Sequence, residues 1–164
     1  MDDETRDNID YVNLTRLQAA YADVVTRRAW SELVPLFEPE TPIIVDVAGG
    51  ETHRFTGPVE IGDFIGSSIE QFDFFQFLIL NTVVEQRIGG DPDRADGRLY
   101  MSELRQFGSN GAWSVVYGIY HDCYRRTDGR WRFMQRKYQT LARTAPQMHV
   151  FDFPHHLEPG SLES

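Results

Sequence analysis

Several residue types that transfer protons or bind anions gather in the stretch GIYHDCYRRTDGRWRFMQRKY, from Gly118 to Tyr138. Tyr120, Asp122 and Arg136 are its candidate catalytic residues. A tyrosine beside a carboxylate can orient a ligand hydroxyl, or transfer a proton if burial raises the pKa of the carboxyl group. The planar guanidinium of an arginine suits an anionic or electronegative group. A structural role is equally open, in which Asp122 pairs with Arg136 across the hairpin.

The phase of the strand decides which of these side chains share a face. Side chains alternate along a strand, so Tyr120 shares a face with Val116 and Asp122, whereas His121 lies on the opposite face. A histidine among apolar neighbours is more often packed and hydrogen-bonded than catalytic. A slip of one residue in this phase would exchange Tyr120 and His121 between the two faces.

Other polar residues in strand-like runs have weaker claims to a site. Asp46 and Glu103 must either face water or find a partner, and water is favoured because buried carboxylates are rare. Asn81 either contacts a ligand or braces neighbouring main-chain groups. Trp131 and Arg136 are five residues apart, which places them on opposite faces of their strand unless a bulge intervenes.

The elements that must position these residues follow from hydrophobic spacing. The pattern predicts a frayed terminus over residues 1–8, an amphipathic helix over 9–28, a short helix over 30–37, strands over 42–48 and 51–57, and a helix that begins at residue 58. After residue 72, long strand-like runs are separated by the turn sequences GGDPDRADG, GSNGA and TDGR. Helices segregated from one antiparallel sheet indicate an α+β fold. Strands this long must curl, so a cone with an internal pocket is expected.

Length and composition predict one soluble domain over residues 1–144 and an irregular, proline-containing tail over 145–164. The chain carries 16 basic and 25 acidic side chains, a net charge of -9, which argues against nucleic-acid binding because phosphates are repelled. Cys123 is the only cysteine, so no internal disulfide can form, and a cytoplasmic location is expected. No apolar run approaches the roughly 20 residues that span a bilayer, so no membrane partner is expected.

The sequence contains no motif for a metal or a cofactor. His149, His155 and His156 lie in the tail, without the i,i+4 spacing of a helical zinc site. There is no phosphate-binding glycine loop, nucleophile elbow or dinucleotide fingerprint. We therefore expect neither a metal nor a cofactor.

The order of elements, together with a set of residues, resembles the SnoaL-like branch of the nuclear transport factor 2 superfamily. The matching residues are Tyr21 with Trp30, Leu33-x-x-Leu36-Phe37, Asn81, Gly118-x-Tyr120-x-Asp122, and Asp128-Gly129-x-Trp131-x-Phe133-x-x-Arg136. The resemblance implies a cone-shaped fold, in which N-terminal helices pack on a strongly curved, mainly antiparallel sheet. Within this branch the chain is similar to two lyases that act on hydrophobic rings, scytalone dehydratase and hexachlorocyclohexane dehydrochlorinase.

These lyases use an aspartate–histidine pair as general base and, in the dehydrochlorinase, an arginine near the leaving group. The resemblance assigns the arginine to Arg136 and the aromatic residue that lines the pocket to Tyr120. The aspartate position falls on Thr26 and the histidine position on Phe77, so both members of the pair are absent. Asp23 does not replace the aspartate, because it points away from the helix face that would line the pocket.

Two classes of function remain open. In the first, the pocket takes a small hydrophobic, cyclic molecule and the protein is a lyase or isomerase, in which Tyr120 and Asp122 handle protons and Arg136 stabilises negative charge. In the second, the pocket binds such a molecule without catalysis, or the sheet is an oligomerisation or partner-binding surface. A homo-oligomer, a dimer or trimer, is expected because the outer face of such a sheet is apolar. The expected ligand-binding residues are Tyr21, Thr26, Phe77, Asn81, Val116 and Tyr138.

Overall fold

A computed structural model describes residues 2–145 and 149–151 of the chain. Its elements are α1 (Asp3–Arg27), the 3-10 helix η1 (Trp30–Leu36), β1 (Pro42–Asp46), β2 (Thr52–Thr56), α2 (Gly57–Ile69), β3 (Phe72–Gln86), the 3-10 turn η2 (Ile88–Gly90), β4 (Arg94–Phe107), β5 (Trp113–Thr127), β6 (Arg130–Arg143) and β7 (His149–Val150). The predicted order of helices, short strands and long strands is confirmed.

Helix α1 starts earlier than the sequence pattern predicts. Asp2 caps its first turn, where the main-chain N–H of Thr5 donates to Oδ1 of Asp2 at 2.7 Å. Arg87, which follows β3, pairs with Asp3 and Asp7 at 3.2 and 2.8 Å. The prediction of a frayed terminus is therefore wrong for residues 3–8, because capping and ion pairs hold a polar segment without an apolar pattern.

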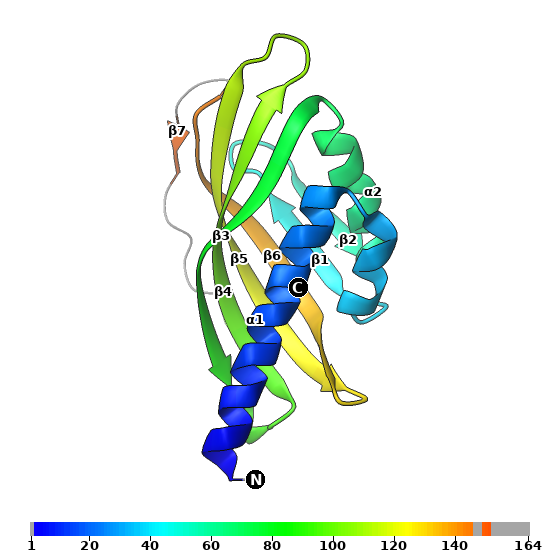
Figure 1. Ribbon diagram of the computed structural model, residues 1–164, viewed down its shortest axis with the longest axis vertical. Coiled ribbons are helices and arrows are strands. Elements are labelled where there is room, and N and C mark those ends of the chain that lie inside the picture. The colour runs from blue at the N-terminus through cyan, green and yellow to red at the C-terminus, as the bar shows by residue number, and fades with distance from the viewer. Residues whose placement is uncertain (1, 146–148, 152–164) are drawn as a thin grey trace.

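The strands form one sheet in the order β2-β1-β6-β5-β4-β3, and β7 pairs with β6. From β3 to β6 each strand pairs antiparallel with the next along the chain. Strand β1 joins β6 in parallel, so the sheet is mixed but mainly antiparallel. Figure 1 shows the long strands crossing the molecule, with α1 lying along them and α2 near one end.

Extra residues interrupt the pairing of the long strands and add to the curl of the sheet. In β6 the register shifts at Met134, which has no partner between the pairs Cys123–Gln135 and Tyr124–Phe133. This bulge brings Trp131 and Arg136 to the same buried face, although they are five residues apart. The exception foreseen from the sequence is therefore the one that applies.

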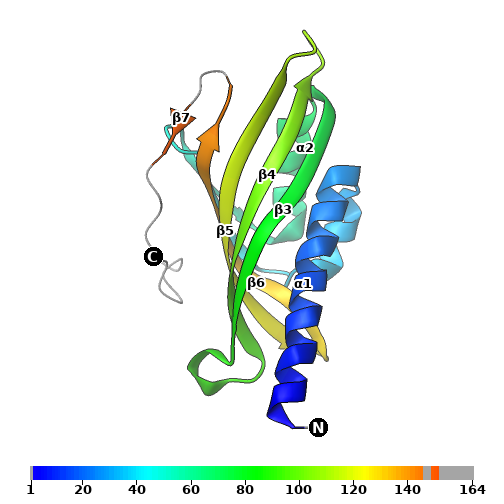
Figure 2. The ribbon, with the colours of Figure 1, turned by 60° about the vertical axis from the view of Figure 1, so that its left-hand side comes forward.

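The helices lie on one face of the sheet, here called the inner face. Figure 2 shows α1 and α2 on the same side of the strands, with β7 toward the other side. The core lies between them, where Leu14, Leu17 and Tyr21 of α1 meet inward side chains of the long strands. These layers confirm the predicted α+β fold. Among the described residues, no helix is long and apolar enough to cross a membrane.

The predicted irregular tail lies mostly outside the described residues. Within it, β7 pairs antiparallel with the end of β6, where Val150 lies opposite Ala142. The main-chain N–H of Phe151 donates to the carbonyl oxygen of Leu141 at 2.9 Å. Residues 149–151 therefore extend the sheet beyond the predicted domain boundary at residue 144.

Candidate functional site

A cavity of about 430 Å³ lies between the inner face of the sheet and helices α1 and α2. This volume is in the range of small-molecule sites. Most of the wall is apolar, and it includes Val25, Ile43, Val45, Ile61, Phe64, Ile65, Ile69, Phe72, Phe77, Phe107 and Val116. The polar and amphipathic side chains in the wall are Tyr21, Ser68, Gln71, Glu103, Arg105, Tyr120, Arg136, Tyr138, Thr140 and Arg143.

Arg136 is a charged group enclosed by aromatic rings. The Cζ atom of its guanidinium lies 3.9 Å from the ring centroids of both Tyr21 and Tyr120, and 4.3 Å from that of Phe133. The residue is 1% exposed yet forms part of the cavity wall. Its Nη1 has no hydrogen-bond acceptor among the residues that the structure describes. Cation–π contacts on several sides hold the charge here in place of water.

Asp122 is the ionic partner of Arg136 and is not part of the cavity wall. Its Oδ1 lies 3.0 Å from Nε of Arg136, and its Oδ2 accepts hydrogen bonds from Nη2 of Arg136 at 3.3 Å and from the hydroxyl of Tyr124 at 3.0 Å. Burial raises the pKa of Asp122 to about 6, against the influence of Arg136 and Tyr124, which lowers it. Both oxygens thus face protein groups, so Asp122 holds Arg136 in position.

A chain of buried hydrogen bonds fixes Asp122 in turn. The hydroxyl of Thr82 on β3 donates to Oε1 of Gln18 on α1 at 2.8 Å. Nε2 of Gln18 donates to the hydroxyl of Tyr124 at 2.8 Å, and Tyr124 donates to Asp122. This series of hydrogen bonds connects helix α1 to the strands and orients the carboxylate that pairs with Arg136.

The hydroxyls of Tyr21 and Tyr120 form the second polar feature near Arg136. Their rings pack edge-on, with centroids 6.0 Å apart. Burial raises the pKa of Tyr120 well above its usual range, and burial likewise raises the pKa of Tyr21. Both hydroxyls therefore keep their protons near neutral pH and act as hydrogen-bond donors rather than bases.

Glu103 lies in the cavity wall, although the sequence favoured a solvated position for it. It lies on β4, with Phe77 of β3 and Val116 of β5 as its partners on either side. Its carboxylate is 3.6 Å from Nη1 of Arg105, and its side chain is 20% exposed. Burial raises the pKa of Glu103, whereas Arg105 lowers it. The expectation that water solvates this carboxylate is wrong, because the cavity and not the bulk solvent lies on its side of the strand.

Thr26 and Phe77, which occupy the positions of the family aspartate and histidine, are hydrogen-bonded to each other. The main-chain N–H of Phe77 donates to the hydroxyl of Thr26 at 3.0 Å, which ties α1 to β3. The Phe77 ring lies in the cavity wall, whereas Thr26 does not. Thr26 therefore reaches the strand and not the cavity, unlike the ligand contact expected of it.

Asn81 also differs from its expected place, because it is exposed and is not part of the cavity wall. The pairing of β3 with β4 shifts between Ile79 and Asn81, so Leu80 is an extra residue. Without it, alternation from Phe77 would direct Asn81 inward. The shift directs Thr82 inward instead, where it contacts Gln18.

Strand β5 presents the face predicted from its alternation. Val116 and Tyr120 are in the cavity wall and His121 is not, so the strand keeps the predicted phase. Tyr138 of β6 also lines the cavity, and its ring lies against the main chain of Gly118. A Cβ atom at Gly118 would collide with that ring, which explains why glycine suits this position.

No group of His, Cys, Asp and Glu able to hold a metal ion occurs within residues 2–145 and 149–151. His155 and His156 lie outside the described residues. Each carboxylate of the site has an arginine as its ionic partner: Asp122 pairs with Arg136, and Glu103 pairs with Arg105. The site is therefore described by its arginines, tyrosines and one carboxylate facing the cavity.

The model of the SnoaL-like domain matches residues 7–137 of the chain. The chain belongs to the SnoaL-like family. No curated protein matches its sequence.

Solved structures with the same fold include proteins that carry the names of the two enzymes in the resemblance above. A scytalone dehydratase-like protein of Novosphingobium aromaticivorans superposes with a TM-score of 0.75 at 17% identity, and the match covers 94% of this chain and 99% of that one. A hexachlorocyclohexane dehydrochlorinase of Novosphingobium barchaimii superposes with a TM-score of 0.69 at 16% identity, covering 95% and 99%. At such identities the likeness establishes the nuclear transport factor 2-like fold.

Proposed function

We propose that the cavity binds a small, mainly apolar ring molecule whose electronegative atom, such as a carbonyl oxygen, accepts hydrogen bonds from Arg136 and Tyr120. The observation that carries the proposal is that Arg136 lines the cavity and that its buried Nη1 donor has no acceptor among the described residues. A buried charged donor left without a partner costs roughly 1–3 kcal/mol or more. A ligand acceptor would remove that cost.

The surroundings of Arg136 support a ring-shaped ligand. The rings of Tyr21 and Tyr120, which lie against its guanidinium, pack together with the wall ring of Phe77, and the three centroids lie 5.7–6.0 Å apart in pairs. Flat apolar molecules pack well against such edge-on and tilted rings. The cavity therefore combines an apolar body with one strong donor position, as small-molecule sites do.

We further propose that the reaction is of the lyase or isomerase type. Such reactions develop negative charge on an oxygen or a leaving group, and Arg136 and protonated Tyr120, which both line the cavity, would stabilise that charge. Arg136 is preorganised, since Asp122 and the hydrogen bonds behind it hold the guanidinium before any ligand arrives. Solved structures of the same fold include enzymes named as a dehydratase and dehydrochlorinases.

The binding step is tested by titrating the protein with cyclohexenone and tetralone, followed by calorimetry. Tyr120→Phe removes one donor and should weaken binding by about 2- to 10-fold, the worth of one neutral hydrogen bond. Tyr117→Phe is the matched control, since Tyr117 is exposed on the outer face of the same strand, and it should leave affinity unchanged. Absence of ketone binding to the unaltered protein, or equal affinity in Tyr120→Phe, would contradict the proposal.

The outer face of the sheet favours the alternative of self-association. Phe74, Trp113 and Tyr117 are 39%, 54% and 43% exposed there, and the rings of Phe74 and Trp113 have centroids 5.4 Å apart. Burial of such a surface would stabilise the predicted homo-oligomer. Sedimentation of the unaltered protein and of Trp113→Glu tests this, because a monomer in both cases rules out the surface.

A further inference from the structure

We propose that Glu103 is the catalytic base of this cavity and accepts a proton from carbon of the bound ring molecule. The inference rests on the proposed function, because it takes the ligand to lie against Arg136 and Tyr120. It assigns the proton transfer to a residue of β4 rather than to Thr26 on α1, the position that corresponds to the family aspartate. It also gives Glu103 a different role from that of Asp122, whose carboxylate pairs with Arg136 and does not line the cavity.

Glu103 is the only carboxylate among the described residues that line the cavity. Its neighbours across the strands, Phe77 and Val116, are apolar and line the cavity beside it. The side chain is 20% exposed, which leaves it accessible to a ligand from within the cavity. Arg105 lies 3.6 Å from the carboxylate and can hold it in place without enclosing it. A carboxylate in this setting has one ionic partner and a free side that faces the ligand space.

The charge of Glu103 reaches the groups that would hold the ligand. Burial is the main reason that the pKa of Tyr138 is raised, and the charge of Glu103 adds to it. The same charge contributes to the raised pKa of Tyr120 and of Tyr21. The proton acceptor and the hydrogen-bond donors therefore act within one cavity, which proton abstraction beside a carbonyl group requires.

The proposed step for a ring ketone balances without a co-reactant. The Glu103 carboxylate takes a proton from the carbon beside the carbonyl group. The C–H electron pair becomes the new C=C bond, and the C=O π electrons move to the oxygen, which Arg136 and Tyr120 stabilise. Return of the proton to the same or a conjugated carbon regenerates the carboxylate and gives exchange or isomerisation.

Burial shifts the pKa of Glu103 upward from its ordinary value of 4.5, which makes it a stronger proton acceptor than a solvated carboxylate. The titratable and charged groups in the same wall are Tyr21 of α1, Arg105 of β4, Tyr120 of β5, and Arg136, Tyr138 and Arg143 of β6. Burial raises the pKa of each of the three tyrosines, so they keep their protons around neutral pH. The exchange rate should therefore rise with pH through the pKa of Glu103. Asp122, whose pKa is raised to about 6, acts on the rate only through its pairing with Arg136.

The test is exchange of ketone hydrogens for deuterium in heavy water, followed by proton NMR with cyclohexenone and tetralone. Glu103→Gln should slow protein-catalysed exchange by roughly 100-fold or more, the usual contribution of a general base. Its affinity for the same ketones should stay within about 3-fold, because the donors Arg136 and Tyr120 remain. Glu103→Asp keeps a carboxylate and should retain part of the exchange and its rise with pH.

Glu38→Gln is the matched control, since Glu38 lies 3.6 Å from Arg132 with a side chain 26% exposed, but outside the cavity wall. It should leave exchange unchanged. Full exchange in Glu103→Gln, or ketone binding without exchange in the unaltered protein, would overturn the role of Glu103 and leave the binding proposal standing. Failure of the unaltered protein to bind either ketone would overturn the proposed function, and the role of Glu103 with it.

Discussion

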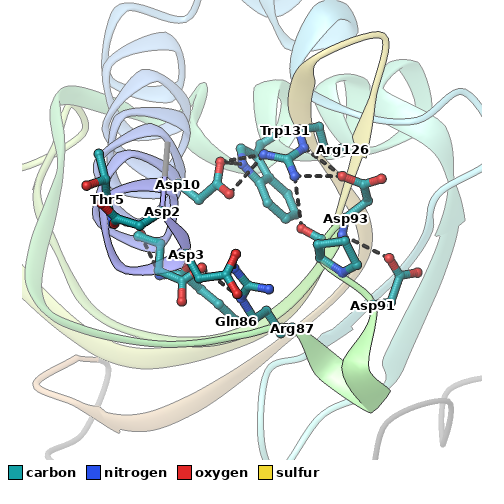
Figure 3. A network of polar contacts seen from close by, with 12 residues as sticks. Asp2, Asp3, Thr5, Asp10, Gln86, Arg87, Asp91, Asp93, Arg126 and Trp131 are labelled. Atoms are coloured by element: carbon teal, nitrogen blue, oxygen red, sulfur yellow. Dashed lines mark hydrogen bonds and ion pairs between the residues drawn. The ribbon is translucent and has the colours of Figure 1, made fainter.

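Two arginines on neighbouring strands differ in their surroundings. Arg136 lines the cavity, whereas Arg126 is 18% exposed and belongs to a cluster with Asp10, Asp93 and Trp131, here called the closed end of the sheet. Arg126 of β5 is clamped between Asp10 and Asp93, and its Nη2 donates to the carbonyl oxygen of Pro92 at 3.0 Å (Figure 3). The ring of Trp131 lies 5.1 Å from its guanidinium. Every nitrogen of Arg126 thus donates to a protein acceptor.

Arg136 has a different environment. It has one carboxylate partner, three enclosing rings, and a donor without an acceptor among the described residues. A fully paired arginine stabilises the fold, whereas one with a spare donor in a cavity can also bind a ligand. The comparison teaches that the partners of a charged residue, rather than its type or burial, distinguish a structural cluster from a candidate site.

The largest effect is expected from removing the charge of Arg136. Arg136→Met leaves Asp122 buried without its counter-ion, which should lower the free energy of unfolding by about 3–5 kcal/mol near pH 8. Urea denaturation measures this loss. A double variant that also carries Asp122→Asn should recover part of it, because the uncompensated carboxylate is then gone. A loss below about 1 kcal/mol in Arg136→Met would contradict this expectation, because the Arg136–Asp122 pair would then contribute no more than an exposed surface ion pair.

The loss in Arg136→Met should also depend on pH. Burial raises the folded-state pKa of Asp122 from 3.8 to about 6, so its contribution to stability is present below the lower value and is lost as pH rises through the upper one. Without Arg136 the folded-state pKa rises further, so the loss extends to higher pH. The stability deficit should therefore narrow near pH 5, where a protonated Asp122 needs no cation. A deficit that widens on acidification would contradict this account.

A smaller effect, confined to stability, is expected at the closed end. Asp10 accepts hydrogen bonds from Arg126 at 2.7 Å and from Nε1 of Trp131 at 2.9 Å. Asp10→Asn should lower the free energy of unfolding by about 1–3 kcal/mol, as expected for weakened buried hydrogen bonds to charged groups. Ketone affinity should be unchanged in calorimetric titration. The matched control is Asp93→Asn, since Asp93 is 54% exposed and should contribute less than about 1 kcal/mol. Weakened ketone binding in Asp10→Asn would remove the distinction between the two ends.

The smallest effect is expected where α1 meets β3. Thr26→Val removes the acceptor for the main-chain N–H of Phe77 and should cost about 0.5–1.5 kcal/mol of stability. Deuterium exchange of bound ketone should persist in this variant, because Thr26 is not in the cavity wall. Loss of exchange with unchanged stability would instead assign Thr26 a part in the chemistry.

The sequence was sufficient for the order of elements and for the face that carries Tyr120, because hydrophobic spacing and alternation are local properties. It could not place Asn81, since one extra residue at Leu80 reverses the phase of β3. It also could not show that Glu103 faces a cavity rather than water. Alternation from the buried residues Leu99 and Met101 places the side chain of Glu103 on the inner face of the sheet. Whether that face borders a cavity at Glu103 depends on helices that are distant in sequence.

The most direct test of the central claim compares Arg136 and Arg126 in one NMR spectrum of their side-chain Nε–H groups, recorded while cyclohexenone is added. Substitution of each arginine in turn assigns the two signals. The account predicts that the Arg136 signal shifts until the protein is saturated with ketone. The Arg126 signal should stay in place, because every nitrogen of the Arg126 side chain already donates within the protein. An unmoved Arg136 signal at saturating ketone, or equal shifts of both signals, would contradict it.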